Sequence, residues 1–393
     1  MYSVYQHWDP LKVCLVGKSY PPEFYSWIKN TKTRNIFERI ARETEEDYQA
    51  LIKLLIQFDV EVLRPTVPVN DKVSSEHYLK NNTYAQPPMT PRDYTGIYGS
   101  DFYHNGDINT VSIFYSSVRD LSWPQEITTI GEMKQLPVSI QDEINNIHWL
   151  DYYAYINRTE VLDSDVFILD PYAEVYNKVA QHTSSFNIVK EMDVLSTATT
   201  VRIGKDIYCN NANATKECLS KPEIFEKYRM HYLNSNDHLD GVFCPVVPGL
   251  IISLNDISTY KDTFPDWEVV YLPDQSWDKI QPFMELKNKN RGKWWIPGEE
   301  YNDDVIETVD TWMSKWVGYV EETVFDVNML VINEKNVIVN NYNKQVFNAL
   351  ERYGVTPHIC NFRHRYFWDG GLHCNTSDLD REGSMKDYFP ERG

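Results

Sequence analysis

The sequence predicts an α/β protein built from several small sheets arranged radially, an α/β propeller. Two observations lead to this prediction: a hairpin pattern recurs four times along the 393 residues, and helical segments lie between the hairpins. A mixed helix and strand unit that recurs in this way favours several sheets around an axis over one doubly wound sheet. Two separate α+β domains are the alternative interpretation.

Each predicted hairpin pairs two apolar or β-branched runs across a short loop of Gly, Asn, Asp or Pro. This combination is typical of two antiparallel strands joined by a tight turn. The sequence therefore predicts hairpins at residues 93–104, 200–210, 242–254 and 328–340.

The clearest helical segment spans residues 36–58, where apolar side chains recur three and four positions apart. No low-complexity tract or flexible linker divides the chain, so we predict one domain over residues 1–393. Residues 260–319 are rich in Trp, Pro and charge, and we expect them to form a long insertion, either a lid or a rim.

The balance of charge excludes some classes of partner. The chain has 57 acidic and 38 basic residues, a formal net charge of −19, so we expect neither a nucleic acid nor a membrane as partner. No basic leader precedes an apolar stretch and no run of about 18 apolar residues occurs, which predicts a cytoplasmic protein. The six cysteines contain no C-x-x-C pair, and we expect free thiols.

Cys374 is the candidate nucleophile. It closes the segment Gly370 to Cys374 (GGLHC), in which two glycines permit a close backbone approach. Such a turn suits a reactive thiol at the mouth of a pocket. A cysteine without this context is more often a small buried apolar side chain.

A histidine and two carboxylates stand at matching places in other repeats. His238 and Asp240 precede the third hairpin, and strand alternation would place them on one face. The imidazole of His238 can carry a proton, and Asp240 would either orient that ring or bind a cation; a surface pair without function is the alternative. Asp93 begins the first hairpin. Because equivalent strand ends of a radial fold converge on its axis, we expect one shared pocket, formed by Asp93, His238, Asp240 and Cys374.

Together these segments resemble the amidinotransferase family, within the wider superfamily of guanidino-modifying α/β propellers (the penteins) that includes arginine deiminases. The matching segments follow the family's order and span nearly the whole chain: residues 7–12 with 16–17, 89–93, 203–208, 238–240 with 248–249, 328 with 333–335, and 370–374. The resemblance implies a propeller of about five pseudo-symmetric ββαβ units around a central pocket. It also suggests a homodimer.

The resemblance implies transfer of an amidino group from a guanidino donor to a small amine acceptor. Cys374 would be the nucleophile, His238 the general acid and base, and Asp93 with Asp240 the carboxylates that hold the guanidinium. The chemistry agrees, since carboxylates bind this planar, forked cation through charge-assisted hydrogen bonds. A covalent amidino-cysteine would form and then react with the acceptor. A hydrolase of the deiminase type and a non-catalytic binding protein of the same fold are the alternatives.

The sequence departs from the family at two places. Ser196 and Thr199 stand where the family has an acidic residue beside the pocket, and Glu321 and Glu322 stand near small hydroxyl residues that receive a substrate carboxylate. We predict a changed substrate rather than lost chemistry, because Cys374, His238, Asp93 and Asp240 are all present. A hydroxyl that suffices, Asp193 in place of the acid, and impaired chemistry are the alternatives. Glu321 or Glu322 in the pocket would also disfavour an α-carboxylate; solvated glutamates are the alternative there.

The remaining expectations concern binding residues and cofactors. Arg92, Thr199, Glu322 and Asn328 are expected to contact the substrate, since each stands in or beside a matching segment. The chain contains no glycine-rich phosphate loop and no set of zinc ligands, so we expect no cofactor and no metal.

Overall fold

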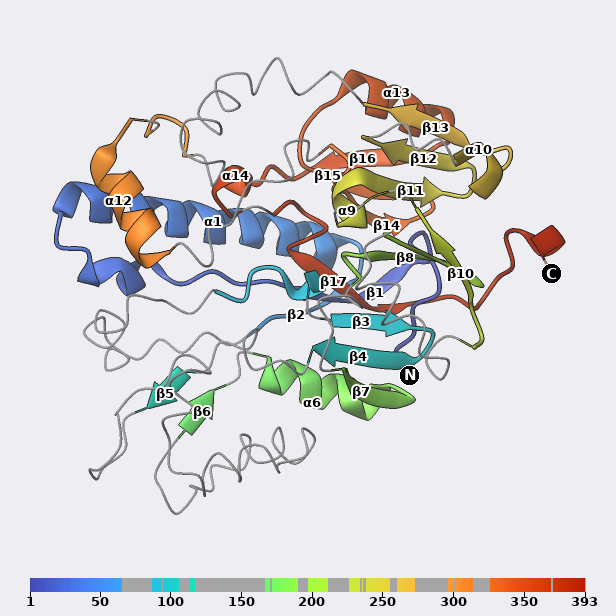
Figure 1. Cartoon of the computed structure of the whole chain (residues 1–393), viewed down its shortest axis with the longest axis horizontal. Helices are drawn as coiled ribbons and strands as arrows, with labels where there is room; N and C mark the ends of the chain where they lie inside the picture. Colours follow the sequence, from blue (N-terminus) through green and yellow to red (C-terminus); the bar gives the residue numbers. More distant parts are fainter. Residues whose placement is uncertain are drawn as a thin grey trace.

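The computed structural model is a mixed α/β molecule with its strands gathered into small sheets (Figure 1). It describes residues 1–65, 87–93, 95–105, 114–116, 167–169, 172–189, 197–210, 226–233, 235, 238–254, 260–272, 296–299, 301–313, 326–368 and 370–392.

Five three-stranded sheets share one topology, in which two antiparallel strands are followed by a third strand parallel to the second. All four predicted hairpins are confirmed as the antiparallel pairs of four of these sheets. These sheets contain β3 (Thr95–Tyr98), β4 (Asp101–Asn105) and β7 (Ser185–Val189); β8 (Thr200–Ile203), β9 (Asp206–Cys209) and β10 (Arg229–Tyr232); β11 (Phe243–Val247), β12 (Leu250–Ser253) and β13 (Glu268–Tyr271); and β14 (Leu330–Asn333), β15 (Asn336–Val339) and β16 (Thr356–Ile359).

The fifth sheet joins the two ends of the chain. β1 (Leu11–Val16) pairs antiparallel with β17 (Thr376–Arg381) and parallel with β2 (Glu61–Leu63). No turn connects β17 to β1, so the hairpin pattern that revealed the other four sheets was not available in the sequence. This pairing places the segment before β17, which carries Cys374, beside the N-terminal strand.

Helices lie between the second and third strands of four sheets. The longest, α1 (Thr31–Gln57), confirms the predicted helix and begins five residues earlier, where the Asn30 side chain accepts hydrogen bonds from the first turn. The others in this position are α6 (Ala173–His182), α10 (Tyr260–Thr263) and α13 (Lys344–Arg352). Such helices provide the crossover that a parallel neighbour requires.

The remaining elements are short. They are the helices α9 (Leu239–Val242), α12 (Asp303–Trp312) and α14 (Arg365–Trp368), the 3-10 helices η1 (Pro22–Trp27), η2 (Pro91–Asp93) and η4 (Pro390–Arg392), and the two-stranded sheet of β5 (Phe114–Ser116) and β6 (Phe167–Leu169). No helix of the described ranges is long and apolar enough to cross a membrane.

The core is divided among three groups of buried side chains. One joins α1 to β1, α12 and α14, and Figure 1 shows α12 and α14 beside α1. A second fills the sheets from β8 to β15 and includes α13. The third packs α6 against β4 and β17. β17 therefore lies where the packing of the N-terminal sheet meets that of the first hairpin sheet.

Part of the expected insertion at residues 260–319 belongs to the third hairpin sheet. Within it, β13 pairs in parallel with β12, and α10 lies between these strands. Residues 273–295, 300 and 314–319 lie outside the described residues, and the role of the segment as a lid or rim stays a prediction.

Candidate active site

Cys374 lies in a buried turn between α14 and β17. The turn is closed by the amide of Asn375, which donates to the carbonyl of Gly371 at 3.0 Å. A Cβ atom added to Gly370 would lie 3.3 Å from the Thr90 side chain and 3.6 Å from the Cβ of Cys374. The close backbone approach expected at this glycine is therefore present, and it brings the cysteine turn against the segment that leads to η2.

Asn328 holds the cysteine turn in place. Its Oδ1 accepts hydrogen bonds from the amides of His373 and Cys374 at 2.8 and 3.3 Å. Its Nδ2 lies 3.0 Å from the Cys374 sulfur and 3.2 Å from the carbonyl of Asp240. This one side chain, immediately before β14, thus connects both sides of the site and places a donor on the sulfur.

Asp240 contacts the sulfur from the other side. Its Oδ2 lies 3.5 Å from Cys374 Sγ and accepts a hydrogen bond of 3.0 Å from His373 Nδ1. The Asp240 amide donates to the carbonyl of Ala198 at 3.2 Å, which fixes it against the turn before β8. A carboxylate from the third hairpin sheet and a thiol from the fifth therefore meet, although 134 positions separate them.

The strand alternation expected for His238 and Asp240 is wrong. Residues 239–242 form the single helical turn α9, and His238 is the residue before it. In a helix, positions two apart do not share a face. His238 instead lies beside Asp93, with 3.8 Å between His238 Nδ1 and Asp93 Oδ1, and its side chain is 47% exposed.

Burial and neighbouring charges act differently on the two carboxylates. Burial raises the pKa of Asp93 above its usual range, and the nearby His238 opposes this shift only in part. For Asp240, burial pushes in the same direction, but the hydrogen bond and charge of His373 outweigh it and hold the pKa below the usual range. Asp240 is thus the carboxylate of the site that stays ionised most readily, and it is the one in contact with the thiol.

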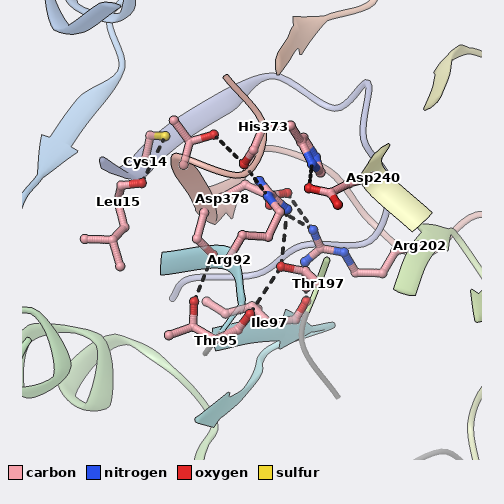
Figure 2. A network of polar contacts seen from close by, with 12 residues as sticks. Cys14, Leu15, Arg92, Thr95, Ile97, Thr197, Arg202, Asp240, His373 and Asp378 are labelled. Atoms are coloured by element: carbon pink, nitrogen blue, oxygen red, sulfur yellow. Dashed lines mark hydrogen bonds and ion pairs between the residues drawn. The ribbon is translucent and has the colours of Figure 1, made fainter. Parts of the chain in front are cut away.

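Arg92 lies behind the site and does not reach solvent. Figure 2 shows it between Asp378 and the segment of His373. Its Nε donates to the His373 carbonyl at 2.7 Å, and its Nη1 donates to Asp378 at 3.1 Å and to Thr197 at 3.2 Å. These contacts give Arg92 a structural role; direct contact with a substrate stays a prediction.

The other expected binding residues are only partly described. Thr199 is buried in the turn before β8, next to the Ala198 carbonyl that holds Asp240. Ser196, Glu321 and Glu322 lie outside the described residues. Asp326, which follows the two glutamates, accepts a hydrogen bond of 2.6 Å from Asn341. The described ranges place no group of three or more His, Cys, Asp or Glu side chains for a metal ion.

His373 is the residue of the site that sequence reasoning missed. Burial, with Arg92 close by, lowers its pKa to about 4, so it is neutral at physiological pH and presents Nδ1–H to Asp240. Its ring also stacks on that of His7, 5.6 Å away. Position next to the candidate nucleophile was the available signal, but sequence alone does not reveal the Asp240 contact.

We expect the neutral state of His373 to make the fold sensitive to acid. A histidine whose folded pKa is depressed contributes stability above its unfolded pKa of about 6.5, and this contribution is lost as the pH falls toward the folded pKa of about 4. The shift corresponds to about 3 kcal/mol of unfolding free energy. Urea unfolding of wild type and His373→Gln between these pH values would measure it. The free energy of unfolding of the variant should depend less steeply on pH than that of wild type. An equal pH dependence in the two proteins would contradict the prediction.

Comparison of sequences finds amidinotransferases. No family model matches the chain. An L-arginine:L-lysine amidinotransferase of Pseudomonas savastanoi pv. phaseolicola is 23% identical over 216 residues, 53% of this chain and 50% of that relative. The matched region thus spans half of this relative. The mitochondrial glycine amidinotransferase of Gallus gallus is 22% identical across 98% of this chain and 84% of its own length.

Comparison of structures gives the same family of folds. An amidinotransferase of saxitoxin biosynthesis from Microseira wollei superposes with a TM-score of 0.55 at 16% identity, over 99% of both chains. The inosamine-phosphate amidinotransferase of Streptomyces griseus superposes with a TM-score of 0.57 at 15% identity, again over 99% of both. The sequence relatives and the solved structures together support the resemblance to the amidinotransferases found in the sequence.

Proposed function

We propose that this protein transfers an amidino group from a guanidino donor to a small amine through a covalent intermediate on Cys374. The observation that carries the proposal is the contact of the Cys374 sulfur with Asp240 and Asn328 in one buried turn. His238 would be the general acid and base, and its Nδ1 lies 3.8 Å from Asp93 Oδ1. The amidinotransferases among the relatives support the same reaction class.

The two carboxylates are suited to a guanidinium. Oδ1 of Asp93 and Oδ1 of Asp240 are buried and accept no hydrogen bond in the part of the chain that the structure describes. Buried carboxylate oxygens are costly unless a donor reaches them. A guanidinium has forked N–H donors and a permanent charge, and it would satisfy both oxygens.

The proposed reaction has two steps, formation and then breakdown of the bond between Cys374 and the amidino carbon. The Cys374 thiolate attacks the central guanidinium carbon, and an S–C bond forms as the C–N bond to the donor breaks. His238 gives its proton to the departing amine. The acceptor amine next loses a proton to His238 and attacks the same carbon, the S–C bond breaks, and the thiolate is regenerated. Asp93 faces His238 and would orient its ring, which accounts for catalysis with Thr199 at the position of an acid.

The other residues have supporting roles in this proposal. Asn328 and Arg92 hold the cysteine turn, and any contact of theirs with substrate is secondary. Thr199 would border the substrate with its hydroxyl. Glu322 would face the acceptor and favour an amine without an α-carboxylate.

The wider architecture is also part of the proposal. The five sheets would form a propeller of pseudo-symmetric ββαβ units around this pocket, as one domain over residues 1–393. A cytoplasmic location and a homodimer are proposals that rest on the sequence and the resemblance.

Intact-mass measurement with a panel of guanidino compounds tests the reaction class. We expect one added amidino group on wild-type protein after incubation with a donor, and loss of that mass when an amine acceptor is supplied, with an amidinated amine as product. Loss of the adduct without acceptor would assign a hydrolase. No modification and no consumption of any compound would favour a binding protein.

A further inference from the structure

A buried cluster of three arginines and one aspartate lies behind the cysteine turn. Asp378 in β17 accepts hydrogen bonds from Arg202 at 2.7 and 2.9 Å, from Arg92 at 3.1 Å and from Arg381 at 2.9 Å. All four side chains are at most 2% exposed. Three guanidinium groups share one carboxylate, so these four side chains by themselves carry a net charge of +2, and a buried charge normally has a partner nearby.

The cluster joins four of the five sheets to each other. Arg92 belongs to η2 at the start of the first hairpin sheet, Arg202 to β8, and Arg381 to β17. Arg381 also donates to the carbonyls of Asp9 and Val331, the second of which lies in β14. The pKa of Asp378 is well below its usual range because these arginines outweigh its burial. Asp378 is therefore ionised, and the three arginines donate hydrogen bonds to both of its oxygens.

Arg92 is the member of the cluster that is directed to the active site. Its Nε holds the carbonyl of His373, one residue before the nucleophile. Its Nη2 is buried and donates no hydrogen bond in the described ranges. The positive charge also lowers the pKa of Asp93, Asp240 and His373, behind the larger effect of burial. Arg92 thus holds the backbone next to Cys374 and acts electrostatically on Asp93, Asp240 and His373.

The need for such a cation follows from the groups around the thiol. The Asp240 carboxylate on α9 contacts the sulfur and disfavours a thiolate because like charges repel, and Asp93 on η2 interacts electrostatically with Asp240. The Tyr48 hydroxyl on α1 is neutral, since burial raises its pKa, and His373 and His7 are neutral because burial lowers theirs. His238 is half exposed and changes charge during the reaction. Arg92 is the permanent cation in contact with the cysteine turn among the described residues.

We propose that Arg92 is a positioning residue for the Cys374 turn and the cation that favours the thiolate form of Cys374 before a substrate binds. The thiol proton leaves to solvent, and the S⁻ then carries the charge that partly offsets the arginine excess. The inference rests on Cys374 as the nucleophile named in the proposed function. It predicts a property of the free protein, so its test requires no substrate.

The test is a pH titration of the Cys374 thiolate by its ultraviolet absorbance, taken for each variant as the difference from the same variant carrying Cys374→Ser. Arg92→Gln retains a donor for the His373 carbonyl but loses the charge, and we expect its midpoint to rise by about one pH unit. Arg92→Lys retains the charge but loses the fork, and its midpoint should stay near that of wild type. Circular dichroism and cooperative melting establish that each variant is folded.

Two further variants distinguish the loss of the Arg92 charge from a disruption of the cluster. Arg202→Gln removes an equal charge from the same cluster without touching the His373 carbonyl, and its midpoint should move less than that of Arg92→Gln. Asp378→Asn removes a negative charge and should move the midpoint down, and it decides the question if Arg92→Gln does not fold. A folded Arg92→Gln with the wild-type midpoint, or Asp378→Asn shifting upward, would overturn the proposal. Absence of transfer activity with these shifts present would instead count against the proposed function alone.

A kinetic measurement separates positioning from charge. If transfer is observed, Arg92→Lys should lower kcat with KM nearly unchanged, since it alters the turn of the nucleophile and not the carboxylates that hold the substrate. A change confined to KM would overturn the positioning role.

Discussion

Replacement of Cys374 by serine is expected to reduce kcat for amidino transfer by about four orders of magnitude or more. A serine hydroxyl stays protonated at neutral pH, and the Asp240 carboxylate beside it would oppose its ionisation further. The covalent intermediate would then not form. Steady-state assay of the amidinated product, with intact mass of the protein after donor alone, measures both consequences.

A second buried thiol serves as the control for this change. Cys244 in β11 is as buried as Cys374, and burial raises its pKa to about 12, so it is neutral and unreactive. Cys244→Ala should retain the amidino adduct and most of the activity. An adduct that persists in Cys374→Ser would assign the nucleophile to another residue.

Replacement of Asp240 by asparagine is expected to reduce kcat/KM by about 100- to 1000-fold, the size seen when one partner of a buried charge pair is removed. The asparagine has nearly the same shape, but it loses the negative charge for the guanidinium. It also places either an amide donor or a neutral oxygen toward His373 and the sulfur. Rates over a range of donor concentrations would show whether the loss falls on KM, as a binding role requires, or on kcat as well.

The matched control is another buried aspartate in a charged cluster. Asp206 in β9 is fully buried and bonded to His231 at 2.6 Å and to Arg229 at 2.7 Å, and none of the site residues contacts it in the described hydrogen bonds. Asp206→Asn should lower the free energy of unfolding and leave KM unchanged. If both variants lower kcat/KM equally, the effect of Asp240→Asn is one of stability and not of substrate binding.

Two contacts in the structure bear on the missing acid at position 199. Thr199 follows Ala198, whose carbonyl accepts a hydrogen bond from the Asp240 amide. Asp93 lies next to His238, where an orienting acid is needed. In the proposed function, Asp93 in η2 would supply a carboxylate for the His238 ring although no acid stands at position 199, which favours a changed substrate over an inactive site.

Local patterns predicted the repeated unit well. Each hairpin between residues 93 and 340 depends on a turn and on two alternating runs that are neighbours in the chain, and each was found where expected. The helix of residues 31–57 is likewise visible because its apolar face follows the helical period. The identity of Cys374, His238, Asp93 and Asp240 as candidates came from the same local signals and from the resemblance.

The sequence by itself thus determined four hairpins, the long helix, the repeating unit and the candidate chemistry. Only the tertiary structure decided which of these residues touch: the pairing of β1 with β17, the contacts of Asn328 and His373 with the site, and the three arginines around Asp378. Hairpins and helices form from neighbours in the chain. Contacts between residues hundreds of positions apart depend instead on how the sheets pack and on where a buried charge finds its partner.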